Sequence, residues 1–217
     1  GAGAGILQDV PKMVKMTSEI VKSTNLPVTV KTRLGWNEKT KYIVDVAERL
    51  QDVGIKAISI HGRTRKQMYK GEADWSLIRE VKNNPRMHIP VFGNGDVQCP
   101  KTAMEKKNKY NVDGIMIGRA AIGNPWIFNQ IKEYLTNGVS IKEPSIIEKA
   151  DMALEHLKLS VDWKGSKLGI LEMRRHYTNY FRGLPQIKKH RSELVQTENY
   201  DELVDIINEI KKMYEHY

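Results

Sequence analysis

Hydrophobic and polar positions follow two alternating patterns between residues 28 and 135. Short apolar or β-branched runs bounded by turn residues predict buried strands at 28–31, 57–61, 89–95 and 114–118. After each run, apolar residues recur every three or four positions, which predicts helices at 42–53, 75–81, 100–107 and 126–135. Asn124 is the expected N-cap of the last of these, with Pro125 at its first position. A further helix is predicted at 10–22, without a strand before it.

Strand and helix units in regular succession favour an α/β fold with a parallel sheet, because each parallel connection needs a crossover helix. Four such units amount to the C-terminal half of a TIM (β/α)8 barrel. A doubly wound sheet is the alternative, but the glycine-rich dinucleotide fingerprint expected after its first strand is missing. The partial barrel is therefore the favoured interpretation, and it is expected to occupy residues 1–143.

The pattern changes after Pro144. Apolar spacing predicts helices at 146–161, 168–182 and 200–214, separated by breaks near Gly165, at 183–185 and around Thr197. Residues 144–217 are therefore expected to form a small all-helical domain that follows the partial barrel.

The net charge of the chain indicates a class of binding partner. The chain has 35 Lys and Arg against 26 Asp and Glu, for a formal net charge of +9, which favours a polyanionic partner. The excess is local in the tail, since residues 158–191 are basic and residues 192–217 are acidic. A solvated helix face is the alternative explanation of the basic segment.

Other functional classes are excluded by composition. The apolar runs are too short for a membrane span, and a single cysteine, Cys99, excludes a disulfide framework or a multi-cysteine metal cluster. The remaining histidines and carboxylates show no metal-ligand spacing, so no metal is predicted. A cytoplasmic location is expected.

Two glycine-rich turns point to an anion site. Asn94, Gly95 and Asp96 follow the third strand, and Gly118 and Arg119 follow the fourth. Glycines let backbone N–H groups approach an anion, and an arginine can bind a phosphate with two hydrogen bonds. Because barrels commonly bind phosphate in the loops after their last strands, these residues predict a phosphate pocket, with ordinary tight turns as the alternative.

Lys31 and His61 end the first and second strands, so both are expected at the carboxyl edge of the sheet. A lysine there can stabilise negative charge on a ring or carbonyl, or form a Schiff base, and a histidine can donate a hydrogen bond to a ligand. A salt bridge and an ordinary structural histidine are the alternatives. Arg63 and Arg65 lie in the next loop with aromatic residues nearby, a combination that suits RNA but also a solvated loop.

Taken together, four motifs in order resemble the tRNA-dihydrouridine synthases, most closely the bacterial B-type branch. They are KTRLGW at 31–36, HGRTR at 61–65, GNGD at 93–96, and GRA at 118–120 followed by GNPW at 123–126. The glycine-rich start at 1–5 and the segment 173–185 are also similar to parts of that family.

The resemblance implies a flavin barrel that uses FMN and NADPH to reduce uridines in tRNA to dihydrouridine. The residues that it assigns to the cofactor are Lys31, His61, Asn94, Gly95, Asp96, Gly118 and Arg119. The residues expected to contact RNA are Arg63 and Arg65 in the basic loop after the second strand, and Arg174, Arg175, Lys188 and Lys189 in the basic segment. A target base must leave its stack to reach the cofactor.

The family's catalytic cysteine would precede residue 1, and Cys99 does not match it, so no catalytic residue is expected within these 217 residues. The expectation is a C-terminal fragment that is inactive alone and that, because its sheet edges are exposed, pairs with another copy or rearranges. Two alternatives remain: a flavin barrel acting on a free pyrimidine, such as a dihydroorotate dehydrogenase, which needs no basic tail, and a non-catalytic RNA-binding module, which retains no flavin.

Overall fold

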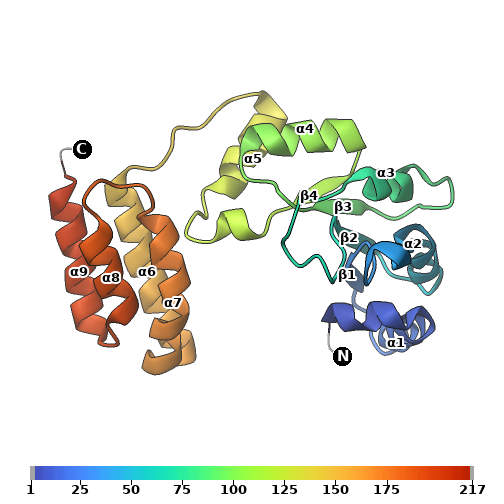
Figure 1. Ribbon diagram of the computed structural model, residues 1–217, viewed down its shortest axis with the longest axis horizontal. Coiled ribbons are helices and arrows are strands. Elements are labelled where there is room, and N and C mark those ends of the chain that lie inside the picture. The colour runs from blue at the N-terminus through green and yellow to red at the C-terminus, as the bar shows by residue number, and fades with distance from the viewer. Residues whose placement is uncertain (1–2, 216–217) are drawn as a thin grey trace. The chain divides into compact units, whose positions relative to one another are not determined.

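The computed structural model describes residues 3–215. The chain forms two compact units, residues 1–118 and 119–217, which are coloured blue to green and green to red in Figure 1. The predicted boundary at 143/144 therefore differs from the division by contacts, which falls earlier. We describe each unit by itself.

The first unit alternates strands and helices, as the hydrophobic pattern predicts. Its strands are β1 (Thr29–Arg33), β2 (Ala57–His61), β3 (Val91–Asn94) and β4 (Gly114–Met116). Its helices are η1 (Gly3–Gln8), α1 (Val10–Lys22), η2 (Glu38–Thr40), α2 (Ile43–Asp52), α3 (Ser76–Asn83) and α4 (Pro100–Tyr110). The helix predicted at 10–22 has the bounds of α1, where Asp9 caps the start by accepting a hydrogen bond from the backbone N–H of Lys12 at 3.0 Å.

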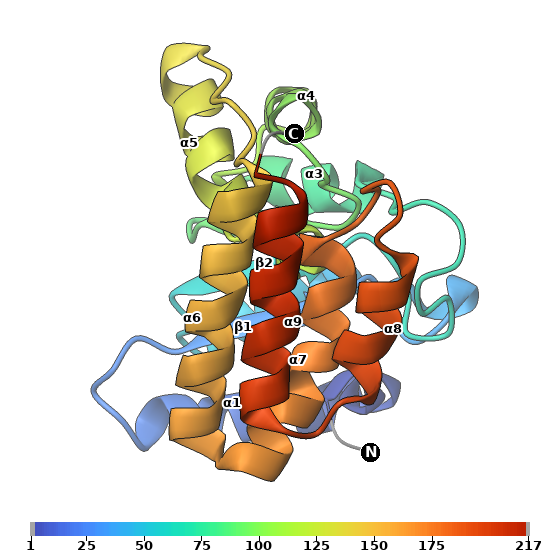
Figure 2. The same cartoon turned by 90° about the vertical axis from the view of Figure 1, so that its left-hand side faces the viewer.

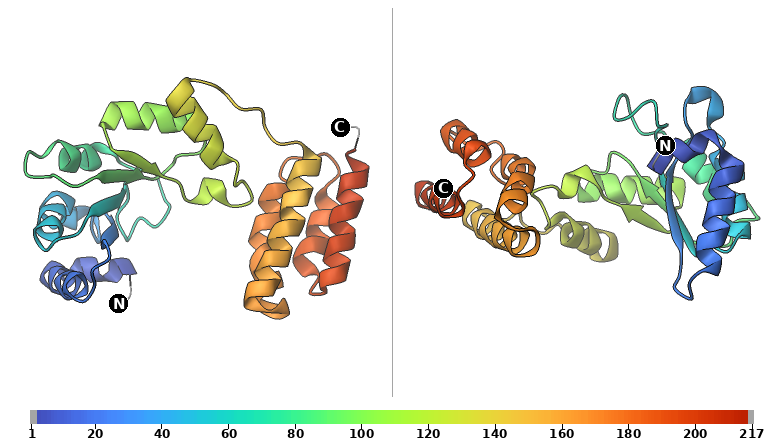
Figure 3. Two further views of the ribbon diagram at one scale, coloured as in Figure 1. Left: turned by 180° about the vertical axis from the view of Figure 1, so that it is seen from behind. Right: turned by 90° about the horizontal axis from the view of Figure 1, so that it is seen from below.

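The four strands form one parallel sheet in the order β1-β2-β3-β4, and α1 to α4 lie in an arc on one side of them (Figure 3). The sheet and its arc of helices are consistent with part of a TIM barrel. The strand side chains that face the helices are buried, among them Thr32, Ile58, Ile60 and Val91. The opposite face carries the polar residues Lys31, Ser59 and His61, because successive residues of a strand point to opposite sides.

The second unit is helical. It consists of η3 (Arg119–Ala121), α5 (Ile127–Asn137), α6 (Ile146–Lys164), α7 (Ser166–Tyr180), α8 (Lys188–Gln196) and α9 (Tyr200–Met213). Figure 2 shows α6, α7, α8 and α9 side by side, and they share a core of fully buried residues that includes Leu157, Met173, Tyr177 and Ile207. Among residues 3–215, no helix is both long and apolar enough to span a membrane.

Two details of the helical unit correct the sequence analysis. Asn124 is not the N-cap of α5, because residues 124–126 form a turn in which the Ile127 N–H bonds to the Asn124 carbonyl at 3.4 Å, and α5 begins after Trp126. Helix α8 was not expected. Its segment contains a single fully buried side chain, Leu194, so the apolar periodicity that marks the other helices is weak there.

Candidate functional site at the carboxyl edge of the sheet

One cross-strand layer brings the predicted polar residues together. The strand register places Arg33 beside His61, His61 beside Asn94, and Asn94 beside Met116. Neighbouring strands lie about 4.8 Å apart, so these residues form a continuous row across the open face, next to the carboxyl edge. Lys31 lies two residues before Arg33 on the same face of β1. The structure therefore clusters Lys31, His61 and Asn94 at the place that the sequence predicts.

The cluster is electropositive. Burial and the nearby Arg33 lower the pKa of Lys31 from its ordinary value. Burial, followed by the positive charges of Arg33, Lys31 and Arg63, lowers the pKa of His61 to about 4, although Asp96 acts in the opposite direction. His61 is therefore a neutral imidazole at physiological pH, with one nitrogen able to donate and the other to accept a hydrogen bond.

Arg33 belongs to this cluster, yet the sequence analysis did not assign it a role. Its guanidinium donates to the backbone carbonyls of Thr64 at 2.9 Å and Met68 at 3.0 Å, so it also holds the loop after β2. The signal was present in the sequence, because residues two apart on a strand point to the same face, and Lys31 was already placed at the site.

Close packing under the turn after β3 fixes the position of His61. A Cβ atom on Gly95 would lie 2.6 Å from Ala73 Cβ and 3.1 Å from the His61 ring, and the backbone there has φ +125°. The buried indole of Trp75 donates a hydrogen bond to the Gly95 carbonyl at 3.1 Å. Only glycine fits both the conformation and the space at position 95, so the turn lies directly against the imidazole.

Asp96 and Arg63 form a buried ion pair. The guanidinium of Arg63, which is 2% exposed, contacts both carboxylate oxygens of Asp96 at 2.9 and 2.7 Å and also the carbonyls of Lys70 and Gly71. The Ala73 N–H donates to the same carboxylate at 2.7 Å. Arg63 therefore organises the loop after β2 and does not present its charge to RNA, which corrects its predicted role. The Asp96 carboxylate is bound to Arg63.

The other predicted phosphate residues lie at or after the edge strand. The Asn94 side-chain amide donates to the Met116 carbonyl at 2.7 Å, which ties β3 to β4. Gly118 has no heavy atom within 4 Å of the place where a Cβ would stand, so its backbone is open to approach. Arg119 begins η3 in the second unit. The structure thus leaves the role of Arg119 in phosphate binding as a prediction.

The predicted RNA-binding residues are exposed to different degrees. Arg175, Lys188 and Lys189 are exposed on α7 and α8, whereas Arg65 is half-buried. Arg174 is half-buried and forms an ion pair with Glu198 at 3.1 Å. Three of the six are therefore exposed, and one of these, Lys189, lies 3.7 Å from the carboxylate of Glu193.

Cys99 is an exposed thiol at the start of α4, with its Sγ 3.6 Å from the Thr102 hydroxyl. Residues 3–215 contain no group of three or more His, Cys, Asp or Glu side chains arranged to hold a metal ion.

Comparisons with known proteins agree on one family. The family described as Dihydrouridine synthase (Dus) matches residues 1–215. The chain is 39% identical over 190 residues to a probable tRNA-dihydrouridine synthase of Rickettsia conorii, which covers 88% of this chain and 57% of that protein. It is 34% identical over 200 residues to tRNA-dihydrouridine synthase B of Pseudomonas aeruginosa (92% and 60%) and 35% identical over 206 residues to that of Vibrio cholerae (95% and 63%). The chain thus spans about three fifths of the length of these relatives.

Proposed function

The chain belongs to the dihydrouridine synthase family, and from this membership we propose that it contributes the C-terminal part of an enzyme that reduces uridine to 5,6-dihydrouridine in tRNA. The observation that carries the proposal is the row formed by Arg33, His61 and Asn94, with Lys31 on the same open face of the sheet. It lies where barrel enzymes place their active sites.

The donor set on this face suits FMN. Lys31 and Arg33 are cations, and the nearest acid, Asp96, is already bound to Arg63, so an electron-rich ring or a phosphate would meet positive charge and N–H donors. We assign Lys31 and His61 to the flavin ring. The backbone of Asn94, Gly95, Asp96 and Gly118, with the Arg119 side chain, is assigned to the ribityl phosphate. When bound, FMN supplies the hydride, and NADPH is the proposed reductant.

The side chains of this chain then have distinct tasks. Lys31 and Arg33 stabilise negative charge that develops at the reacting rings, and they are fixed in advance by the strand and by the loop carbonyls. His61 remains neutral near pH 7 and donates one hydrogen bond without adding a charge. The Gly95 turn holds the imidazole in place.

The basic residues of the helical unit support tRNA as the partner. Arg175, Lys188 and Lys189 are exposed, and phosphate contacts by such side chains supply much of the affinity for nucleic acids. We assign these three residues, with the half-buried Arg65 and Arg174, to the tRNA surface. A free pyrimidine would need no such surface.

A chimera tests the function directly. This chain replaces the matched segment of the Pseudomonas aeruginosa tRNA-dihydrouridine synthase B, and the purified chimera is assayed with FMN, NADPH and an unmodified tRNA transcript. Mass spectrometry of the digested tRNA should detect uridine that has gained two hydrogens. Replacement of Lys31 by Met in the chimera should abolish the product. A folded, flavin-loaded chimera that oxidises NADPH with a free pyrimidine but leaves tRNA unmodified would refute the proposal.

The cofactor assignment has its own test. Arg119→Ala should weaken FMN binding by the chimera, measured by the flavin absorbance that remains after desalting. Gly5→Ala serves as the control, because no atom lies within 4 Å of its Cβ position. Equal flavin retention by Arg119→Ala and the unsubstituted chimera would remove Arg119 from the phosphate site.

A further inference from the structure

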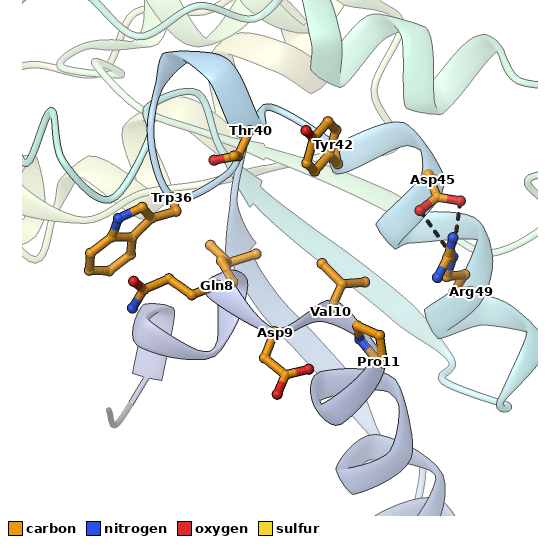
Figure 4. Close-up of a pocket in the computed structure, with 10 residues that line it drawn as sticks. Gln8, Asp9, Val10, Pro11, Trp36, Thr40, Tyr42, Asp45 and Arg49 are labelled. Carbon is orange, nitrogen blue, oxygen red and sulfur yellow. Dashed lines mark hydrogen bonds and ion pairs between the residues drawn. The ribbon is translucent and has the colours of Figure 1, made fainter.

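A groove of about 680 Å³ lies between the start of α1 and the loop that follows β1. Its walls include Gln8, Pro11, Trp36, Thr40 and Tyr42. Figure 4 shows Trp36 beside Gln8 on one side of the groove and Tyr42 on the other, with Val10 and Pro11 below Tyr42. Nothing in the proposed reaction uses these side chains.

The loop that carries Trp36 is held rigidly. Its backbone carbonyl at Trp36 accepts a hydrogen bond from the Lys66 N–H at 2.9 Å, and that of Gly35 accepts one from the Arg65 N–H at 2.9 Å. Asn37 and Thr40 cap η2 in the same loop, and a Cβ on Gly35 would lie 1.9 Å from the Thr40 carbonyl oxygen. The half-buried indole is therefore carried on a fixed backbone, which lowers the entropy lost when a ligand stacks on its exposed part.

The chemistry of the lining selects a planar, uncharged ring. Two aromatic side chains offer stacking surfaces, and the Gln8 amide can hydrogen-bond the edge of a ring, whereas the Thr40 hydroxyl is engaged with Asn37. Among the lining residues, all within the described part of the chain, the charged side chains are Arg49, which is paired with Asp45 at 3.0 Å, and Asp9, which caps α1. No unpaired cation in the lining would bind a phosphate. A nucleobase, in contrast, could stack its face on an aromatic side chain and form a hydrogen bond through its edge.

From these observations we propose that the groove binds an unpaired base of the tRNA, separate from the uridine that is reduced. This inference rests on the proposed function. Trp36 follows Arg33 by three residues, so the groove lies at the same edge of the sheet as the cationic row. Bases in unpaired RNA can turn out and stack on aromatic side chains, whereas bases within a helix cannot. The groove then fixes which unpaired stretch of the tRNA reaches the site.

The first test compares Trp36→Ala with Trp36→Phe in this 217-residue chain, using an unmodified tRNA transcript and fluorescence anisotropy. Trp36→Ala should weaken binding about tenfold, within the range for loss of one base–aromatic stack, while Trp36→Phe should keep most of the affinity. The slope of log affinity against log salt should stay unchanged, because no charge is removed. Leu26→Ala, an exposed apolar truncation before β1, should bind like the wild type.

Cross-linking gives an answer that does not depend on stability. A tRNA transcript containing 4-thiouridine is irradiated with the wild-type chain, and the linked peptide is sequenced. A link at Trp36 or Tyr42 is expected. Links confined to α6–α9, with full affinity in Trp36→Ala, would overturn the groove proposal and leave tRNA binding intact.

Two other outcomes would overturn the groove proposal. If the wild-type chain neither binds nor cross-links to tRNA, both the groove proposal and the tRNA partner are refuted. If Trp36→Ala dissociates a dimer in RNA-free sedimentation experiments, the groove belongs to an interface between copies of the chain, and the proposal is overturned.

Discussion

Gly93 has no room for a side chain, because the indole of Trp75 covers it. A Cβ atom there would lie 2.0 Å from Trp75 Cζ3, and Trp75 is 1% exposed and cannot retreat. Gly93→Ala should therefore lower the free energy of unfolding by about 2 kcal/mol, within the range for overpacked cores. Urea unfolding followed by circular dichroism measures the loss.

Gly118→Ala is the matched control for this substitution. Nothing lies within 4 Å of its Cβ position, and its backbone is not in the left-handed region. The same methyl group should change stability by less than about 0.5 kcal/mol there. Similar losses at both positions would show that the loss of glycine's backbone freedom, and not the contact with Trp75, sets the effect.

The neutral state of His61 makes stability depend on pH. Its pKa is about 4 in the folded protein and near 6.5 in the unfolded chain, so the unfolded state binds more protons between these values. Its contribution to stability is complete above about pH 6.5 and is lost as the pH falls toward 4. NMR titration of the His61 ring should report a pKa of about 4.

Arg33→Gln tests the electrostatic cause. Removing this positive charge should raise the pKa of His61, since Arg33 is the largest charge effect after burial. Arg79→Gln removes the same charge from the exposed surface of α3 and should leave the His61 titration unchanged. An unaltered His61 pKa in Arg33→Gln would exclude Arg33 as a cause and leave burial, Lys31 and Arg63 to account for the shift.

Among the single residues, the alternation of side chains along a strand correctly predicted that Lys31 and His61 lie together. The Arg63–Asp96 ion pair was beyond its reach, because these residues are 33 positions apart and belong to different loops. Charge alone made Arg63 resemble an RNA contact. Its burial depends on the carbonyls of residues 70 and 71, whose positions no local pattern specifies.

Among the elements, α6 begins with a complete capping box. The Ser145 hydroxyl accepts a hydrogen bond from the Glu148 N–H at 3.2 Å, and the Glu148 carboxylate accepts one from the Ser145 N–H at 2.7 Å. The Ser145 N–H and the Ser145 hydroxyl both donate to the Glu148 carboxylate, which holds the pKa of Glu148 below its ordinary value. Ser145→Ala should destabilise the helical unit by about 1 kcal/mol in urea unfolding.

Two further serine variants separate capping from other effects. Ser145→Asp keeps an acceptor at the N-cap and should restore most of the stability. Ser166→Ala lies at the start of α7, where Gly165 is the cap residue and no side chain caps the helix, so it should have little effect. A full loss in Ser145→Asp would contradict the capping explanation.

Elements were predictable where burial is one-sided. The strands and α1 to α4 appeared from the pattern because each hides one face against the other layer. Helix α8 did not, because it contributes only Leu194 to the fully buried core and is otherwise polar. Asn124 has the right residue type for an N-cap, but the turn at 124–126 delays the helix to Ile127.

For the whole molecule, the sequence motifs identified the family, and the match over residues 1–215 confirms it. The four motifs fall on three strand ends and one turn, so each could be identified from the local sequence pattern alone. Self-association is a prediction that follows from topology: β1 and β4 lie at the two edges of the described sheet. Sedimentation at increasing protein concentration should show a rising mass if these edges pair.

The asymmetric charge of the helical unit gives the last prediction. Lys188→Glu and Lys212→Glu change the net charge equally, but Lys188 begins α8 in the basic segment and Lys212 ends α9 in the acidic one. Lys188→Glu, alone or with Arg175→Glu, should weaken tRNA binding at low salt. Each lost phosphate contact should also reduce the slope of log affinity against log salt by about 1.

Lys212→Glu should leave that slope unchanged, although it reduces long-range attraction to the same extent. Net charge alone would weaken binding equally in both variants. Only the loss of a direct phosphate contact reduces counterion release, and with it the slope, in one variant and not in the other. Equal slopes for Lys188→Glu and Lys212→Glu would mean that tRNA senses the overall charge of +9 and not a surface on α7 and α8. Unequal slopes would locate the phosphate backbone on the basic side of the helical unit.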